Sequence, residues 1–206
     1  MDLLFKLSVP AVIGMMVIGL YPLMDGVFAG NIIGQNAMTA CSVAMPLTFI
    51  NNGVATLLGI GSASILSRAL GKGDDKTVNS IMGNLMFWVL LFSAVITVGG
   101  IILAPNFLSM LGAKGEIHAL GIRYLRIIFL GSVFVNFAQS ANMVMRGEGL
   151  MKKAMMIMGL GALINIVLDP ILMKTMGDRG IEGAALATVA AQVIQAMVTL
   201  HYFLKK

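Results

Sequence analysis

The sequence predicts an all-α membrane protein, a polytopic bundle of six transmembrane helices. Hydrophobic residues make up 58% of the 206 positions and charged residues only 11%, less than half the roughly 25% charged residues of a typical soluble domain. The mean hydropathy is +0.93. The charged residues also fall mainly between long apolar runs, each able to cross ~30 Å of hydrocarbon at ~1.5 Å per residue.

The charged positions divide the chain into six apolar segments. The second and third are separated by a polar loop with the turn sequence Gly71-Lys72-Gly73-Asp74, and Pro105 closes the third. No soluble domain and no cleavable signal peptide is expected, so residues 1–206 form one six-helix lobe. The only cysteine, Cys41, excludes an internal disulfide. The expected spans are residues 7–33, 39–67, 80–103, 120–145, 154–173 and 183–204.

Lysine and arginine are distributed unequally between the two membrane faces. The face with both termini, loop 2–3 and loop 4–5 carries nine of them, and the opposite face carries five. The richer face is expected to be cytoplasmic, which places both termini inside an inner (cell) membrane. The nine are Lys6, Arg68, Lys72, Lys76, Arg146, Lys152, Lys153, Lys205 and Lys206; the five are Lys114, Arg123, Arg126, Lys174 and Arg179.

Two acidic residues, Asp25 and Asp169, fall inside predicted spans. A charged aspartate at the centre of a span costs roughly 2.5–3.5 kcal/mol, and such residues usually face the bundle interior or a water-filled cavity. Measured from the basic residues at the cytoplasmic ends of their helices, Asp25 lies ~28 Å and Asp169 ~24 Å along the axis. They therefore reach similar heights in the outer half of the membrane, although each could instead be a packing carboxyl bonded to a neighbouring helix.

Other polar residues reach the same region. Asn165 precedes Asp169 by one turn on the same helix face, and Thr188 lies ~9 Å inward from Glu182. Polar stripes on two more helix faces favour a lined cavity, with hydrogen bonds between helices as the alternative. The expected cavity-lining residues are Asn136, Gln139, Asn142, Gln192 and Gln195.

Two carboxylates with amide and hydroxyl oxygens can bind Na⁺ through oxygen ligands. Burial disfavours the charged carboxylate, so such a pair can also bind and release protons near neutral pH. Pro22 and Pro170 lie beside the two acids and could supply a hinge or a free carbonyl, or could be tolerated kinks.

Several other functions are disfavoured. The basic residues form no stripe for nucleic acid. His118 and His201 lie far apart and, with one cysteine, make no metal site. Gly59-Ile60-Gly61-Ser62 ends an apolar helix with no preceding strand, so it indicates helix packing rather than phosphate binding. No enzyme and no cofactor is expected. The rival from another class is an intramembrane aspartyl protease, but the aspartates stand in the sequences MDG and LDP rather than YD and GxGD.

Three stretches together resemble one transporter family, multidrug and toxic compound extrusion (MATE). NIVLDPILMKTMGDRGIEGAALATVAAQ, residues 165–192, resembles the end of its helix 5 and the start of helix 6. YPLMDGVFAGNIIG, residues 21–34, resembles its first helix, and GIGSASILSRALGKGDD, residues 59–75, resembles helix 2 and loop 2–3. The order and spacing of these matches extend the resemblance along the whole chain.

This resemblance implies an exporter of amphipathic, often cationic drugs and toxins that is driven by Na⁺ or H⁺. The family's cation site in the N-terminal lobe would fall on Asp25, Asn165, Asp169 and Thr188. Members of the family have about twelve helices in two lobes, so a C-terminal six-helix lobe is an expected partner beside substrate and membrane lipid, and the chain is expected to be a fragment or one half. A lipid-linked precursor flippase is the nearest alternative, disfavoured because no lysine or arginine is expected inside the spans.

Overall fold

The computed structural model describes residues 12, 16 and 23–205, and the part described is a helical bundle without strands. Residues 23–32 are helical. The helices that follow are α2 (Gln35–Lys72), α3 (Asp75–Met110), α4 (Gly115–Leu130), α5 (Ser132–Gly147), α6 (Met151–Thr175) and α7 (Gly180–Leu204), with the short 3-10 helix η1 (Gly177–Arg179) before α7. The predicted all-α bundle is therefore confirmed.

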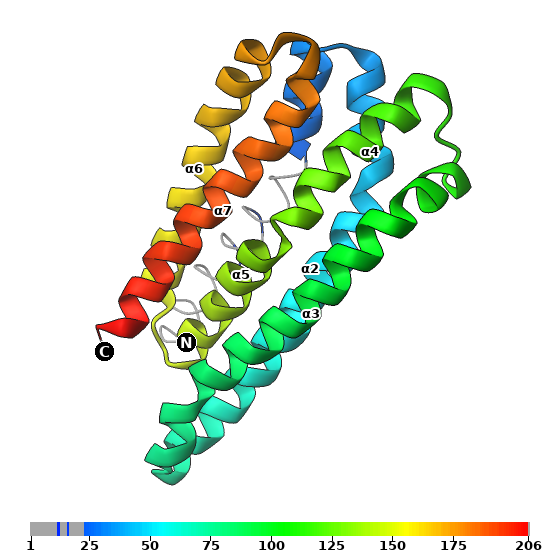
Figure 1. The fold of residues 1–206 in the computed structure, drawn as a ribbon. Coiled ribbons are helices and arrows are strands. Elements are labelled where there is room, and N and C mark those ends of the chain that lie inside the picture. Colours follow the sequence, from blue (N-terminus) through cyan, green and yellow to red (C-terminus); the bar gives the residue numbers. More distant parts are fainter. Residues whose placement is uncertain (1–11, 13–15, 17–22, 206) are drawn as a thin grey trace.

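Two antiparallel helix pairs flank a central pair (Figure 1). The long helices α2 and α3 run side by side on one flank, α6 and α7 form a hairpin on the other, and α4 and α5 follow one another between them. The turn between α2 and α3 is built as the sequence indicates: Gly73 adopts the left-handed conformation (φ 69°), and the Asp74 side chain accepts a hydrogen bond from the Thr77 amide at 3.1 Å. That bond satisfies one of the free N–H groups at the start of α3.

Four described helices, α2, α3, α6 and the segment Gly177–Leu204, are long and apolar enough to cross a membrane. Helices α4 and α5 make a fifth span if counted together, although they meet at a bend of 56°. The expected first span, 7–33, lies largely outside the described residues, Pro22 included. The third helix continues past Pro105 to Met110 instead of ending there, and α6 likewise continues through Pro170.

Small residues let the helices approach closely inside the bundle. A Cβ at Gly59 would lie 2.9 Å from the Ser140 Cα, and one at Gly183 would lie 2.7 Å from the Leu172 carbonyl. These contacts join α2 to α5 and α6 to α7, and they confirm the packing role for Gly59, whereas a Cβ at Gly61 would meet nothing within 4 Å. Large apolar side chains such as Val95, Val98 and Ile102 of α3 are exposed, as expected for a surface that faces lipid.

Candidate functional site

Asp25 and Asp169 meet inside the bundle. Asp25 lies on the helical segment 23–32 and Asp169 on α6, and their exposed fractions are 2% and 0%. Their carboxyl groups are close enough to share a hydrogen bond. Two carboxylates so close and so poorly hydrated repel each other, so the pair needs a proton or a cation to neutralise part of its charge.

The two other predicted residues join this pair through hydrogen bonds. The Thr188 hydroxyl on α7 donates to Asp25 Oδ2 at 3.0 Å. The Asn165 amide donates to Asp169 Oδ1 at 3.1 Å and to Thr188 Oγ1 at 3.2 Å. The structure thus brings together all four residues that had been grouped by their predicted depth in the membrane and by the family resemblance.

Tyr124 completes the cluster and was missed in the sequence. Its hydroxyl, on the buried face of α4, donates to Asp25 Oδ2 at 2.8 Å. A signal was present, because Tyr124 stands near the outer start of the fourth predicted span, level with Asp25. A tyrosine is less conspicuous within an apolar span than a carboxyl, an amide or a threonine, because most of its side chain is apolar.

One oxygen of each carboxyl has no hydrogen-bond partner. Asp25 Oδ1 and Asp169 Oδ2 are both fully buried and unpaired among the described residues. Buried polar atoms are almost always satisfied, so each exception needs an explanation. The oxygens of Asp25, Asp169 and Thr188, with the amide oxygen of Asn165, form a set suited to a hard cation, and a proton shared by the two carboxyls would serve equally.

The close packing of α6 and α7 sets this geometry. Gly183 allows α7 to lie against the backbone of α6 near Leu172, three residues after Asp169. On the other side of α7, Gly131 allows the junction of α4 and α5 to approach Val189, since a Cβ there would lie 2.5 Å from a Val189 methyl group. Thr188 is therefore held between the helix that carries Asp169 and the helices that carry Tyr124 and the pocket residues.

A pocket extends from Asp25 between α2, α4, α5, α6 and α7. Its cavity volume is about 100 Å³, and it is partly open to the outside. Of the five residues expected to line a cavity, Gln139, Asn142, Gln192 and Gln195 do so. Asn142 and Gln195 also bond across helices: the Asn142 amide donates to the Ala154 carbonyl at 2.7 Å, and the Gln195 amide donates to the Met158 carbonyl at 3.1 Å. Polar residues of α2 that the sequence did not single out, Thr48, Asn51 and Asn52, line the same pocket.

Asn136 does not line the pocket, so this expectation was wrong. Its side chain is fully buried, and its amide donates to Asn51 Oδ1 at 3.1 Å and to Ser93 Oγ at 2.9 Å. It joins α5 to α2 and α3, which is the hydrogen-bonding alternative for that stripe. The bend before α5 redirects the helix, so a straight-helix projection of residues 120–145 does not assign faces correctly.

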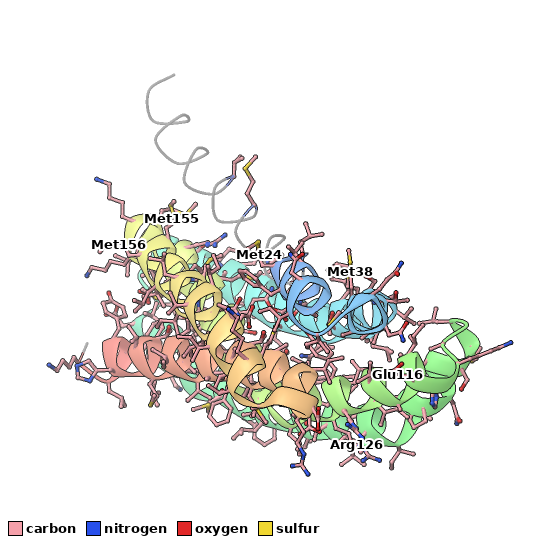
Figure 2. All side chains as sticks on the ribbon, turned by 90° about the horizontal axis from the view of Figure 1, so that it is seen from above. Met24, Met38, Glu116, Arg126, Met155 and Met156 are labelled. Carbon is pink, nitrogen blue, oxygen red and sulfur yellow. The ribbon has the colours of Figure 1, made fainter. Side chains whose placement is uncertain are left out.

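Three arginines lie elsewhere than the sequence indicated. Arg146, assigned to a loop, is half-buried at the end of α5 and lines the pocket. Arg123 and Arg126, also assigned to a loop, are exposed on α4, and Figure 2 shows Arg126 at the outside of the bundle. The expectation that no lysine or arginine stands inside the spans is therefore wrong, because all three arginines lie on the bent helix pair that makes one candidate span. No cluster of three metal-ligating side chains occurs within the described residues.

Comparison with known proteins gives consistent matches. A family model described as MatE matches residues 10–171. The multidrug export protein MepA of Staphylococcus aureus (strain MRSA252) is 28% identical over 198 residues, which cover 96% of this chain and 44% of that protein. A crystal structure of MATE in the bent conformation superposes with a TM-score of 0.91 at 32% identity, covering 97% of this chain and 44% of that one.

A further solved structure is a MOP superfamily transporter from Pyrococcus furiosus, described by the reverse polarity of its binding pocket. It superposes with a TM-score of 0.88 at 31% identity, again covering 97% of this chain and 44% of that one. The chain thus spans somewhat less than half the length of the relatives it matches.

Proposed function

Because the chain belongs to the MatE family, the multidrug and toxic compound extrusion transporters, we propose that it is the N-terminal half of a multidrug exporter coupled to Na⁺ or H⁺. Its relatives are multi-pass membrane proteins, and the apolar helices of this chain agree with that. The export activity, the amphipathic substrate with a cationic group and the partnership with a second six-helix lobe are parts of this proposal. So are the inner-membrane location and the cytoplasmic termini.

One observation carries the proposal: two adjoining buried carboxyls each keep an oxygen without a partner among the described residues. Neutral donors, Tyr124, Thr188 and Asn165, hold the remaining oxygens. An arrangement of this kind favours binding of one positive charge, because two buried carboxylates without a bound proton or cation would repel each other. Such a reversible site gives an exporter the coupling ion that an antiport cycle requires.

The pocket beside the pair supplies a place for substrate. It combines apolar walls with a few polar groups, as ligand sites generally do. Substrate and coupling ion would then bind in adjacent regions, with Asp25 belonging to both. Occupation of Asp25 by Na⁺ or H⁺ would remove the negative charge that attracts a cationic substrate, and this competition couples export to ion entry.

The two rival functions fit the geometry less well. A peptidase dyad must present both carboxyls to water and a peptide, whereas Asp169 here is completely buried and does not line the pocket. A flippase for phosphate-bearing lipids requires a strongly basic cavity, whereas Arg146 is accompanied by an aspartate at the other end of the pocket.

The test is gradient-driven efflux from vesicles that contain this chain together with a second six-helix half. An imposed inward Na⁺ or H⁺ gradient should drive export of an amphipathic dye cation such as ethidium. Asp25→Asn and Asp169→Asn should abolish it, because asparagine keeps the shape but cannot carry the charge. Asp178→Asn, which changes an exposed acid of η1, should have no effect. Undiminished efflux in both buried-site variants would refute coupling through this pair.

A further inference from the structure

The exposed face of α4 carries two arginines that belong to neither the coupling pair nor the pocket. Arg123 and Arg126 stand about one turn apart, between Ala119 and Leu130, and all four residues are exposed. Their helical spacing places them in one stripe along α4. Figure 2 shows Arg126 at the outside of the bundle. The stripe therefore faces the surroundings of the protein rather than its interior.

Both arginines stand within the membrane-spanning part of the chain. Tyr124 lies between them in sequence, and its hydroxyl donates to the buried Asp25 at 2.8 Å, so the arginines share the level of the coupling pair on the outer side of α4. Counted from the start of α4, Arg123 and Arg126 lie about 12 Å and 17 Å along the helix. A charged side chain that faces hydrocarbon at such a depth is unfavourable unless it finds a partner.

The described part of the protein does not provide that partner. Neither guanidinium forms a hydrogen bond or an ion pair with a described residue, and Glu182 in the first turn of α7 pairs with neither of them. The one acid of α4, Glu116, accepts a hydrogen bond from Asn36 of α2 at 2.6 Å and precedes Arg123 by seven residues, or about 10 Å of helix. The two positive charges therefore require an anion from the surroundings.

The direction of α4 favours an anion at one membrane surface. The helix begins at the end of the bundle that holds η1 and runs inward (Figure 1). Because Cα–Cβ bonds tilt toward the start of a helix, both arginine stems lean toward that end and can raise their charged heads to the headgroup region. Residues three apart on a helix have Cβ atoms about 5–6 Å apart, so two guanidiniums can contact one phosphate. Leu130, further inward on the same stripe, is exposed to the acyl chains.

We infer that Arg123 and Arg126 bind the phosphate of an anionic phospholipid in the leaflet on the η1 side of the membrane. Arginine recognises phosphate through paired hydrogen bonds to its planar guanidinium. Two positive charges favour a lipid of net negative charge over a zwitterionic one. Neither arginine lines the pocket, so this lipid is bound at the protein surface and is not a transported compound. The inference goes beyond the proposed function and depends on neither the coupling ion nor the substrate.

The experiment titrates the purified chain in detergent with phosphatidylglycerol or phosphatidylcholine of identical acyl chains, and native mass spectrometry counts the bound lipids. The first phosphatidylglycerol should bind the wild type about tenfold or more tightly than the first phosphatidylcholine, because two basic residues contribute. Changing both arginines, Arg123→Gln with Arg126→Gln, should abolish this preference and leave phosphatidylcholine binding unchanged, which also shows that the variant is folded. Each single variant should lose part of the preference, so the result does not depend on the double variant alone.

A charge-matched control separates this site from general attraction. Arg68→Gln with Lys72→Gln also removes two exposed positive charges one helical turn apart, but from the end of α2 at the opposite end of the bundle, and should keep the full preference. A preference that persists without Arg123 and Arg126, an equal loss in the control, or no preference in the wild type would overturn the inference.

Two other anions are tested in the same way, by repeating the titration with excess inorganic phosphate and with the second six-helix half present. Neither addition should remove the preference for phosphatidylglycerol. Its loss with inorganic phosphate would indicate a site for a free anion, and its loss with the second half would assign this face of α4 to contact between the halves; either result would overturn the lipid site. Ion coupling is read separately from efflux in the Asp25 and Asp169 variants.

Discussion

At the scale of single residues, the two side chains that are least favourable inside a membrane lie together in the bundle. Two aspartates that would each be expensive in lipid share one site, where three neutral side chains supply donors. The sequence was sufficient to find Asp25 and Asp169, because acids inside apolar runs are conspicuous, and helix periodicity added Asn165 and Thr188. It was not sufficient for Tyr124 or Arg146, whose roles depend on which way a bent helix turns them.

Tyr124→Phe tests the contribution of the missed residue. The change removes the hydroxyl that donates to Asp25 Oδ2, and loss of a hydrogen bond to a charged group should destabilise the fold by about 1.5–3 kcal/mol. The melting temperature in nanodiscs should fall accordingly. Tyr202→Phe is the control, because the Tyr202 ring packs against Lys153 and Phe203 and phenylalanine retains that ring. An equal effect of the two changes would contradict a special role for the Tyr124 hydroxyl.

At the scale of helices, the bend between α4 and α5 is the main feature that the sequence did not reveal. Residues 120–145 read as one apolar span, yet the helix breaks at Gly131 and turns by 56°. The Thr97 hydroxyl of α3 donates to the Phe129 carbonyl at 2.7 Å, supporting the break from another helix. A single glycine in an apolar run is common in membrane helices, so its effect became visible only once Val189 was placed against it.

Gly131→Ala should destabilise the bundle by about 1–3 kcal/mol, the usual cost of overpacking, because the new methyl group would meet both methyl groups of Val189. Val189→Ala in the same molecule should restore most of the loss. The control is Gly53→Ala in α2, where a Cβ would meet nothing within 4 Å. Thermal unfolding of the wild type, Gly131→Ala, Val189→Ala and the double variant forms a double-mutant cycle. A double variant no more stable than Gly131→Ala would show that the Val189 side chain is not what the new methyl group meets.

The start of α3 predicts a pH effect outside the membrane spans. Hydrogen bonds from the Thr77 side chain and amide hold the pKa of the Asp74 carboxyl below its ordinary value. A carboxyl with a depressed pKa in the folded state adds stability above its unfolded pKa of about 3.9, and that stability is lost as pH falls through the lower folded value. Asp74→Asn keeps a capping oxygen but removes this titration.

The melting temperatures of wild type and Asp74→Asn should therefore differ most above about pH 5 and converge toward pH 3. Thr77→Val, which removes the hydroxyl donor to Asp74 Oδ2, should reduce the same pH-dependent difference. A difference between wild type and Asp74→Asn that stayed constant over this range would show that the charge of Asp74 does not stabilise the helix start.

At the scale of the whole molecule, hydropathy predicted most of the architecture. Apolar runs located the helices because lipid requires every backbone group to be bonded within its own span. The ends were less predictable: α2 and α3 are 38 and 36 residues long, well beyond the ~20 needed to cross a bilayer. Helix continuation past the membrane depends on capping and packing that hydropathy does not measure.

Membrane orientation gives a prediction at this scale. The excess of lysine and arginine at one end predicts that the α2–α3 turn faces the cytoplasm and η1 faces outside. In a Cys41→Ala background, a membrane-impermeant maleimide added to intact cells should label Asp178→Cys and not Asp75→Cys. Labelling of Asp75→Cys alone would mean that the topology is inverted.

The central claim is that Asp25 and Asp169 together bind one exchangeable positive charge. The direct measurement is equilibrium binding of ²²Na⁺ to the purified chain, with proton release recorded in the same buffer. The wild type and Asp178→Asn should bind one Na⁺ or exchange one proton, whereas Asp25→Asn and Asp169→Asn should do neither. Wild-type binding or exchange that is unchanged in both buried-site variants, or absent from the wild type, would contradict the account.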